Sequence, residues 1–209
     1  MLQYISQGKT AAEHLKNIER ACQAGVKWVQ LRMKNVTDEV YLTTAKRAKE
    51  ICKSYNAIFV VNDSMYVAIH SYADGVHLGK EDESPVLARK LLGTNIVGGT
   101  ANTLQDCEKL IAAKVDYIGL GPFRYTETKK NLSPILGIEG YKHILAHVPD
   151  SVPVIAIGGI TPLDVSALVS VGVSGIAVSG ILTLDHLEQI RTNVKLIEEH
   201  AYETITNSK

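Results

Sequence analysis

The stretch VDYIGLGPFRYTETKK, residues 115–130, begins one copy of the strand–loop–helix unit from which the chain is built. It opens on a mostly apolar run that ends at Gly119, as in a buried strand that leads into a loop. Beyond the loop, a helix is expected from about residue 137 to residue 147. Residues 115–147 are therefore predicted to form a strand, a polar loop and a helix, in that order.

Units of one strand and one helix recur along the whole chain. The expected strands cover residues 2–6, 26–31, 57–61, 75–78, 95–98, 115–119, 152–157 and 175–178. The expected helices cover about residues 10–24, 36–55, 64–71, 84–91, 103–113, 137–147, 161–171 and 185–199. About eight such units in 209 residues match the count and length of a compact (β/α)8 TIM barrel.

The strands are short and apolar without clean alternation, as expected for parallel strands that are covered on both faces. A doubly wound open sheet is the competing topology, but it normally has fewer strands and a glycine-rich turn after the first. Residues 6–9 read SQGK and lack that turn. No linker or low-complexity tract interrupts the chain, so residues 1–209 are expected to form one domain.

The composition limits the kinds of molecule that the protein is expected to bind. The formal net charge is zero, which argues against a nucleic acid or an anionic membrane as partner and leaves small molecules. The longest apolar runs are far shorter than the roughly 18 residues of a membrane span. No signal-peptide pattern opens the sequence, and its three cysteines, Cys22, Cys52 and Cys107, are widely spaced, as in reduced thiols. These features predict a cytoplasmic protein and leave a homo-oligomer open.

The chemistry is expected where the strands end, because all strands of such a barrel point their carboxyl ends toward one face. Polar, charged or phosphate-binding residue types stand at or just after seven of the expected strands: Gln30, Arg32, Lys34, Asn62, Asp63, Asp82, Thr100, Thr126, Thr128, Lys129, Gly159, Val178 and Ser179. We expect these residues to line a single site.

Asp63 and Asp82 follow neighbouring strands and are predicted to hold Mg²⁺, which typically takes one or two carboxylates and completes its shell with water and phosphate oxygens. Each has a plainer interpretation. Asp63 could be the N-cap of the helix that begins near residue 64, and Asp82 could be one acid of the run EDE at 81–83. Taken together, the two acids at one end of a barrel favour the metal.

Two anion sites are expected at this face. The pair Gly158-Gly159 and the pair Val178-Ser179 lie where such barrels often hold a phosphate on backbone N–H groups. The loop after the sixth strand brings two threonines and a lysine that suit a pyrophosphate. No nucleophile–base pair stands among these positions. His77 lies within a strand and is interpreted as a core histidine, whereas helix capping is the plainer alternative to a site role for Thr100 and Asn102. The set indicates departure of a pyrophosphate and its replacement by a substrate that carries a phosphate.

Seven motifs, in this order and spacing, make the chain resemble the thiamine-phosphate synthase (thiamine-phosphate pyrophosphorylase) family over nearly its whole length. They are QLRMK at 30–34, ND at 62–63, GVHLG-x-x-D at 75–82, G-x-T at 98–100, GP-x(3)-T-x-TK at 121–129, AIGGI at 156–160 and AVSG at 177–180. The family joins 4-amino-2-methyl-5-hydroxymethylpyrimidine diphosphate to 4-methyl-5-(2-phosphoethyl)thiazole, and releases thiamine phosphate and pyrophosphate.

The resemblance implies a role for each matched position. The acids Asp63 and Asp82 would hold Mg²⁺. The diphosphate would be bound by Arg32, Lys34, Asn62 and Lys129, and Thr100 would lie near the reacting centre. Gln30, which belongs to the same motif as Arg32 and Lys34, would also bind substrate. The thiazole phosphate would be bound by Thr126, Thr128, Gly159, Val178 and Ser179. The reaction would be dissociative, in that pyrophosphate leaves before the thiazole nitrogen attacks.

Three positions depart from the family pattern. Thr100 stands where serine is common, Asn102 where some relatives carry histidine, and Arg124-Tyr125 where Phe-Pro is usual. The last change is expected to make the loop less rigid and to add a charge. The loop, residues 123–136, is expected to close over the substrates because it is long, glycine-flanked and polar.

Two other functions remain as alternatives. A thiazole tautomerase of the same superfamily would share the thiazole-phosphate site but needs a general base near the ring; Asn102, in place of a histidine, and the acids argue against it. A non-catalytic phosphometabolite-binding barrel would keep the phosphate site and would have no need for Asp63 and Asp82. A sugar-phosphate epimerase barrel is a weaker match, since it requires histidine metal ligands.

Overall fold

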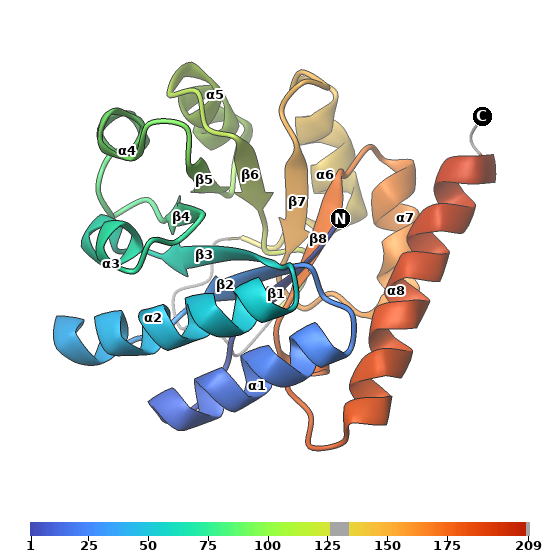
Figure 1. Ribbon diagram of the computed structural model, residues 1–209. Coiled ribbons are helices and arrows are strands. Elements are labelled where there is room, and N and C mark those ends of the chain that lie inside the picture. Colours follow the sequence, from blue (N-terminus) through green and yellow to red (C-terminus); the bar gives the residue numbers. More distant parts are fainter. Residues whose placement is uncertain (126–133, 208–209) are drawn as a thin grey trace.

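The computed structural model describes residues 1–125 and 134–207 and shows a closed barrel of parallel strands surrounded by helices (Figure 1). The strands are β1 (Leu2–Ile5), β2 (Trp28–Leu31), β3 (Ile58–Asn62), β4 (Gly75–Leu78), β5 (Ile96–Ala101), β6 (Tyr117–Leu120), β7 (Val154–Ile157) and β8 (Gly175–Val178). Each strand pairs with the next, and β8 pairs with β1. The single (β/α)8 barrel predicted from the sequence is confirmed.

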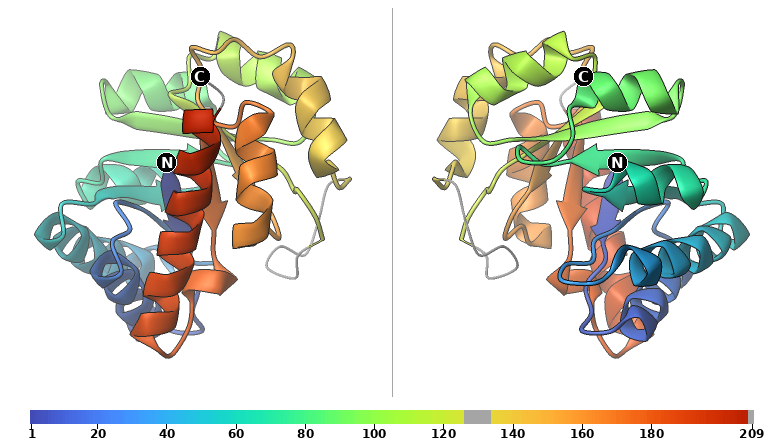
Figure 2. Two further views of the ribbon diagram at one scale, coloured as in Figure 1. Left: turned by 90° about the vertical axis from the view of Figure 1, so that its right-hand side faces the viewer. Right: turned by 90° about the vertical axis from the view of Figure 1, so that its left-hand side faces the viewer.

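The helices follow the strands one by one. They are α1 (Ala11–Gln23), α2 (Asp38–Ser54), α3 (Met65–His70), α4 (Pro85–Leu92), α5 (Leu104–Ala112), α6 (Gly137–Leu145), α7 (Val165–Ser170) and α8 (Leu187–Asn207), with short 3-10 turns η1 (Pro162–Asp164) and η2 (Gly180–Leu182). Helix α8 packs against both α7 and α1, which closes the ring of helices (Figure 2). Within the described residues, no helix is both long and apolar enough to cross a membrane.

Two hydrophobic clusters hold the barrel together. The larger one lies between the strands and the helices and includes the buried thiols Cys22, Cys52 and Cys107, all free. The smaller one draws Ile5, Trp28, Val60, Tyr117, Ile155 and Ala177 from six strands into the barrel interior. The ring edge of Trp28 meets Tyr117, with centroids 4.8 Å apart. The strands are therefore buried on both faces, as their mostly apolar sequences indicate.

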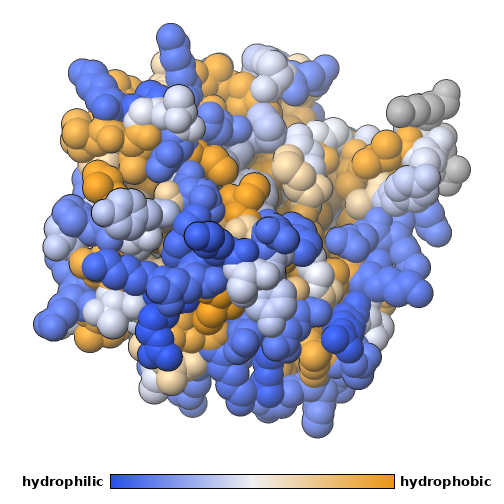
Figure 3. Space-filling model, viewed as in Figure 1, coloured by the Kyte–Doolittle hydropathy of each residue, from blue (hydrophilic) through white to orange (hydrophobic). Residues whose placement is uncertain are grey.

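Helix α4 leaves several apolar side chains exposed. Only Ala88 among its residues is buried, whereas Val86, Leu87 and Leu91 are exposed. Hydrophobic side chains gather over this helix in Figure 3, on a face that is otherwise a mixture of hydrophilic and hydrophobic residues. Helix α4 therefore buries less apolar surface than its sequence offers.

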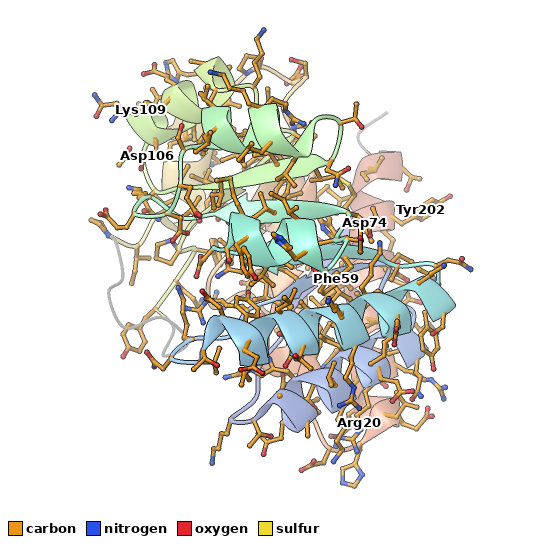
Figure 4. All side chains as sticks on the ribbon, turned by 60° about the vertical axis from the view of Figure 1, so that its left-hand side comes forward. Arg20, Phe59, Asp74, Asp106, Lys109 and Tyr202 are labelled. Atoms are coloured by element: carbon orange, nitrogen blue, oxygen red, sulfur yellow. The ribbon has the colours of Figure 1, made fainter. Side chains whose placement is uncertain are left out.

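Carboxylates stabilise the face at which the strands begin. Asp74, just before β4, accepts a hydrogen bond from the Phe59 amide of β3 (2.8 Å) and forms an ion pair with Lys49. Figure 4 labels Asp74 and Phe59 beside α3. Asp116, just before β6, accepts in the same way from the Val97 amide of β5 (2.7 Å). Each acid thus anchors the first residues of the preceding strand.

Two element boundaries were wrong in an informative way. The fifth strand, expected to end at residue 98, continues to Ala101, so Thr100 lies within it. The seventh helix, expected as one piece, begins as η1 and becomes α-helical only at Val165. The Asp164 amide donates to the Thr161 carbonyl (3.1 Å), the three-residue spacing of a 3-10 turn, while the Asp164 carboxylate accepts from the Thr161 amide (2.8 Å).

Candidate active site

A cavity of about 520 Å³ opens where the strands end. It is lined by every predicted site residue that the structure describes: Gln30, Arg32, Lys34, Asn62, Asp63, Asp82, Thr100, Gly159, Val178 and Ser179. The other three, Thr126, Thr128 and Lys129, lie outside the described residues, as does most of the loop expected to close, so their roles and that closure stay predictions. Residues from every part of the barrel thus meet in one cavity.

Asp63 and Asp82 converge on Gly79. A Cβ atom added there would lie 2.9 Å from Asp82 Oδ2 and 4.0 Å from Asp63 Oδ1, so glycine leaves room for both carboxylates. The Gly79 amide donates to Asp82 Oδ2 (2.6 Å), and Lys34 forms an ion pair with Asp63. The N-cap of α3 is Ser64, which rules out the capping interpretation of Asp63.

The electrostatics of this pair favour a cation. Burial, together with the neighbouring Asp63, raises the pKa of Asp82 to about 6. A carboxylate that is hard to ionise beside a second carboxylate gains from a positive charge placed between them. Two oxygen ligands and an adjacent open cavity suit Mg²⁺, which keeps several positions for water and phosphate oxygens. Asp63 and Asp82 therefore fit the role of magnesium ligands, and no group of three or more acidic, histidine or cysteine side chains offers another metal site among the described residues.

Arg32 and Lys34 face this cavity from the segment that follows β2, while Met33 between them is buried in the core. The backbone at Arg32 is fixed by Ser6, whose Oγ accepts a hydrogen bond from the Arg32 amide (3.1 Å). The same hydroxyl lies 2.8 Å from Nδ1 of His14. The Ser6 hydroxyl accepts from the Arg32 amide and can donate its proton to Nδ1 of His14 when that nitrogen is unprotonated.

This arrangement makes a prediction about pH. Burial lowers the pKa of His14, whereas an unfolded chain has a histidine pKa of about 6.5. Below about pH 6.5 the unfolded state therefore binds a proton at this histidine that the folded state does not, so the contribution of His14 to the free energy of unfolding falls as the pH falls. The raised pKa of Asp82 acts in the opposite direction over the same range, so the test compares variants: between pH 8 and pH 5.5, urea unfolding should show a smaller loss of stability in His14→Asn than in the wild type. The exposed His186, replaced in the same way, is the control; an equal loss of stability in His14→Asn would contradict the assignment.

Tyr41 of α2 holds together the ends of the two strands that carry most of the charged residues. Its hydroxyl lies 2.8 Å from the carbonyl oxygens of both Leu31 and Asn62, the last residues of β2 and β3. Burial, and then the charge of Asp63, raises the pKa of Tyr41, so the hydroxyl stays protonated and can donate. Helix α2 thereby positions the segments that begin with Arg32 and Asp63.

The floor of the cavity is a chain of polar side chains inside the barrel. His77 is hydrogen-bonded through Nε2 to Thr100 Oγ1 (2.9 Å) and through Nδ1 to the Tyr117 hydroxyl (2.9 Å). Gln3 contacts the same hydroxyl (3.5 Å) and accepts from Gln30 (3.4 Å). His77 is buried, as expected of a core histidine, but it also lines the cavity.

Gln3 and Tyr117 are therefore parts of the site that sequence reasoning missed. The signal for Gln3 was a polar residue between the apolar residues of the first strand. The helix-capping interpretation of Thr100 and Asn102 is wrong, because Thr103 caps α5. Asn102 instead lines the cavity and donates to the Gly121 carbonyl.

The expected phosphate site at Gly158-Gly159 and Val178-Ser179 lies at the ends of β7 and β8. In the closed order of strands, these lie opposite β3 and β4, which carry Asp63 and Asp82. Gly158 and Gly159 have φ values of 100° and 67°, a conformation that favours glycine. A Cβ atom on Gly158 would lie 2.7 Å from the Cα atom of Pro122. Ser179 donates its hydroxyl proton to the Ile5 carbonyl (2.8 Å), which leaves backbone groups as the donors available near it. Glycines here let two loops approach each other closely.

Comparison with known proteins agrees with this geometry. The family model described as "Thiamine monophosphate synthase" matches residues 2–182. The chain belongs to the thiamine monophosphate synthase family. It is 48% identical over 186 residues to the thiamine-phosphate synthase of Flavobacterium johnsoniae (87% of this chain, 88% of that protein). It is 45% identical over 183 residues to the thiamine-phosphate synthase of Bacteroides fragilis (86% and 90%).

A solved structure supports the same family. The thiamine phosphate pyrophosphorylase from Pyrococcus furiosus superimposes with a TM-score of 0.82 at 25% identity, covering 97% of this chain and 96% of that one. The resemblance inferred from the motifs is therefore confirmed. As a thiamine monophosphate synthase family member, the chain is a transferase of thiamine biosynthesis.

Proposed function

We propose that the chain joins hydroxymethylpyrimidine diphosphate to thiazole phosphate, with Mg²⁺, to give thiamine phosphate and pyrophosphate. The observation that carries the proposal is the convergence of Asp63 and Asp82 on Gly79, beside Lys34, in the cavity that also contains Gly159. One wall suits a metal-bound diphosphate, and the other suits a phosphate monoester.

The reaction requires one bond to break and one to form. The bond between the pyrimidine methylene carbon and the diphosphate oxygen breaks, and its electron pair leaves with pyrophosphate. The thiazole nitrogen then donates its lone pair to the methylene carbon, which bears the positive charge. No proton transfer is needed, so the reaction requires no general base.

The chain's own residues would stabilise the leaving group. Mg²⁺, held by Asp63 and Asp82, would supply positive charge to the diphosphate oxygens. Arg32 and Lys34 add fixed cations on the same wall, with the Arg32 backbone held in place by Ser6. Thr100, held by His77, lies at the floor, where the pyrimidine would sit. Charge that is already in position costs no reorganisation when the bond breaks.

The test is pyrophosphate release by the purified protein, measured with both substrates and with Mg²⁺ added or chelated. Release that requires both substrates and the metal would support the proposal. Isomerisation of a thiazole carboxylate phosphate without pyrophosphate release would instead identify a tautomerase. Binding of thiazole phosphate with neither activity would identify a non-catalytic binding protein.

A further inference from the structure

Arg124 joins the loop after β6 to the loop after β7. Its guanidinium donates to both carboxylate oxygens of Asp164, at 2.8 and 2.7 Å, and to the Gly159 carbonyl at 3.2 Å. It also lies over the Phe123 ring, 4.9 Å from the centroid. This two-bond contact with a carboxylate is the geometry in which arginine binds most strongly and most specifically.

Asp164 is itself fixed at the other end of this contact. It accepts hydrogen bonds from the backbone amide (2.8 Å) and the hydroxyl (2.7 Å) of Thr161. Burial alone would raise the pKa of Asp164, but the hydrogen bonds from Arg124 and Thr161 outweigh burial and lower the pKa. The carboxyl is therefore ionised at neutral pH, and the charge that Arg124 adds to the loop is neutralised.

The backbones of the two loops are joined at the same place. The Phe123 amide donates to the Ile157 carbonyl (2.9 Å), and the Arg124 amide donates to the Gly158 carbonyl (3.0 Å). Arg124 therefore binds two successive carbonyl groups, that of Gly158 through its backbone and that of Gly159 through its side chain. Arg124 itself is therefore bound to four groups, while the expectation of a less rigid loop concerns residues that mostly lie outside the described ones and stays a prediction.

The orientation of these carbonyls determines the direction of the neighbouring amides. In a planar trans peptide, the C=O of one residue and the N–H of the next point in opposite directions. With the carbonyls of Gly158 and Gly159 turned toward Arg124, the amides of Gly159 and Ile160 are turned away from it. Both residues line the cavity, and successive N–H groups of this kind form an anion-binding concavity.

We propose that Arg124, with Asp164, is a positioning residue for the phosphate monoester, holding the Gly158–Ile160 backbone so that its amides face the cavity. This inference rests on the proposed function for the identity of the monoester, but the contact itself does not. Arg124 acts through the backbone and keeps its own charge on Asp164. A direct contact between Arg124 and the phosphate is the competing arrangement, and the two make opposite predictions for Asp164.

The experiment measures binding of inorganic phosphate and of thiazole phosphate by calorimetric titration, without the pyrimidine substrate. Arg124→Gln removes the guanidinium, and Asp164→Asn keeps an oxygen that can accept from Thr161 while it removes the charge. Both variants should bind phosphate about tenfold or more weakly, as expected when a site is displaced by a fraction of an ångström. The fold of each variant is checked by thermal unfolding, and Arg191→Gln, which removes an exposed ion pair with Glu188 on α8, is the matched control.

Kinetics separate positioning from a general structural effect. Arg124→Gln should raise KM for the thiazole phosphate. It should leave KM for the diphosphate and kcat at saturation within about threefold of the wild-type values. The KM of Arg124→Lys for the thiazole phosphate should lie between those of the wild type and Arg124→Gln. Unchanged phosphate affinity in both variants would overturn the inference. So would tighter binding by Asp164→Asn, because a released guanidinium would then be binding phosphate directly. If the variants lose phosphate binding and the wild type releases no pyrophosphate, the proposed function fails and the positioning role stands.

Discussion

Asp63→Asn is expected to lower the rate of Mg²⁺-dependent pyrophosphate release by about a hundred- to a thousandfold, the range seen when one preorganised electrostatic contact to a transition state is lost. Asparagine is the right replacement because Asp63 has a φ of 67°, a conformation that asparagine tolerates and alanine does not. The variant keeps the size of the side chain but loses the charge that pairs with Lys34 and that we propose binds the metal.

The same variant should not be less stable than the wild type. The ion pair between Lys34 and Asp63 is half exposed on the lysine side and contributes little to stability. Removing one of two adjacent carboxylates also relieves their repulsion. Asp185→Asn, at a carboxylate with 93% exposure, is the control for loss of a negative charge. Full metal-dependent activity in Asp63→Asn would refute the assignment of Asp63 as a magnesium ligand, and a collapse in stability would show that the acid is structural.

Gly98→Ala is expected to destabilise the barrel by about 3 kcal/mol, as when a methyl group is forced into a well-packed interior. For a chain of this size, the melting temperature should fall by roughly 6–12 °C. The added Cβ atom would lie against the ring of Tyr117, 2.6 Å from its oxygen. That ring is only 3% exposed, lies against Trp28, and is hydrogen-bonded to His77, so it cannot move without disturbing the floor of the cavity.

Two further variants identify the cause of that loss. Gly180→Ala is the matched glycine control, because its new Cβ would come no closer than 3.8 Å to another residue. A double variant, Gly98→Ala with Tyr117→Ala, should be less destabilised than the sum of the single variants, because the clash disappears with the ring. Additive losses in urea unfolding would mean that the Gly98 position is sensitive for another reason.

The same glycine shows where sequence reasoning failed on the fold. Gly98 and Gly99 were interpreted as the end of a strand, since glycine usually breaks one. In the structure both lie within β5, and each leaves space for a large side chain, Tyr117 in one case and Leu110 in the other. Which function a glycine has in a strand depends on a neighbour that lies far away in sequence, so local pattern could not decide it.

The candidate site divides in a similar way. Residues at strand ends, such as Lys34 and Asp82, could be predicted because the barrel topology alone brings those ends together. The interior contacts of His77 could not, because they depend on which side chains meet across the barrel. The capping interpretation of Asp63 could likewise be excluded only from the structure, in which Ser64 is the cap of α3, and the metal-binding role of Asp63 stays a proposal. The anchoring of Arg124 by Asp164 required knowledge of how two loops approach each other.

The anchoring of β3 and β5 by Asp74 and Asp116 has a consequence for how this protein can change. Those acids act at the end of the barrel opposite the cavity, where the strands begin. A loop at the mouth that makes no contact with its neighbours can therefore be exchanged by itself, whereas the segment that begins at Arg124 must be exchanged together with the loop after β7, to which Arg124 is bound. Grafting of these two loops as a pair is thus a route to altered substrate preference on the same scaffold.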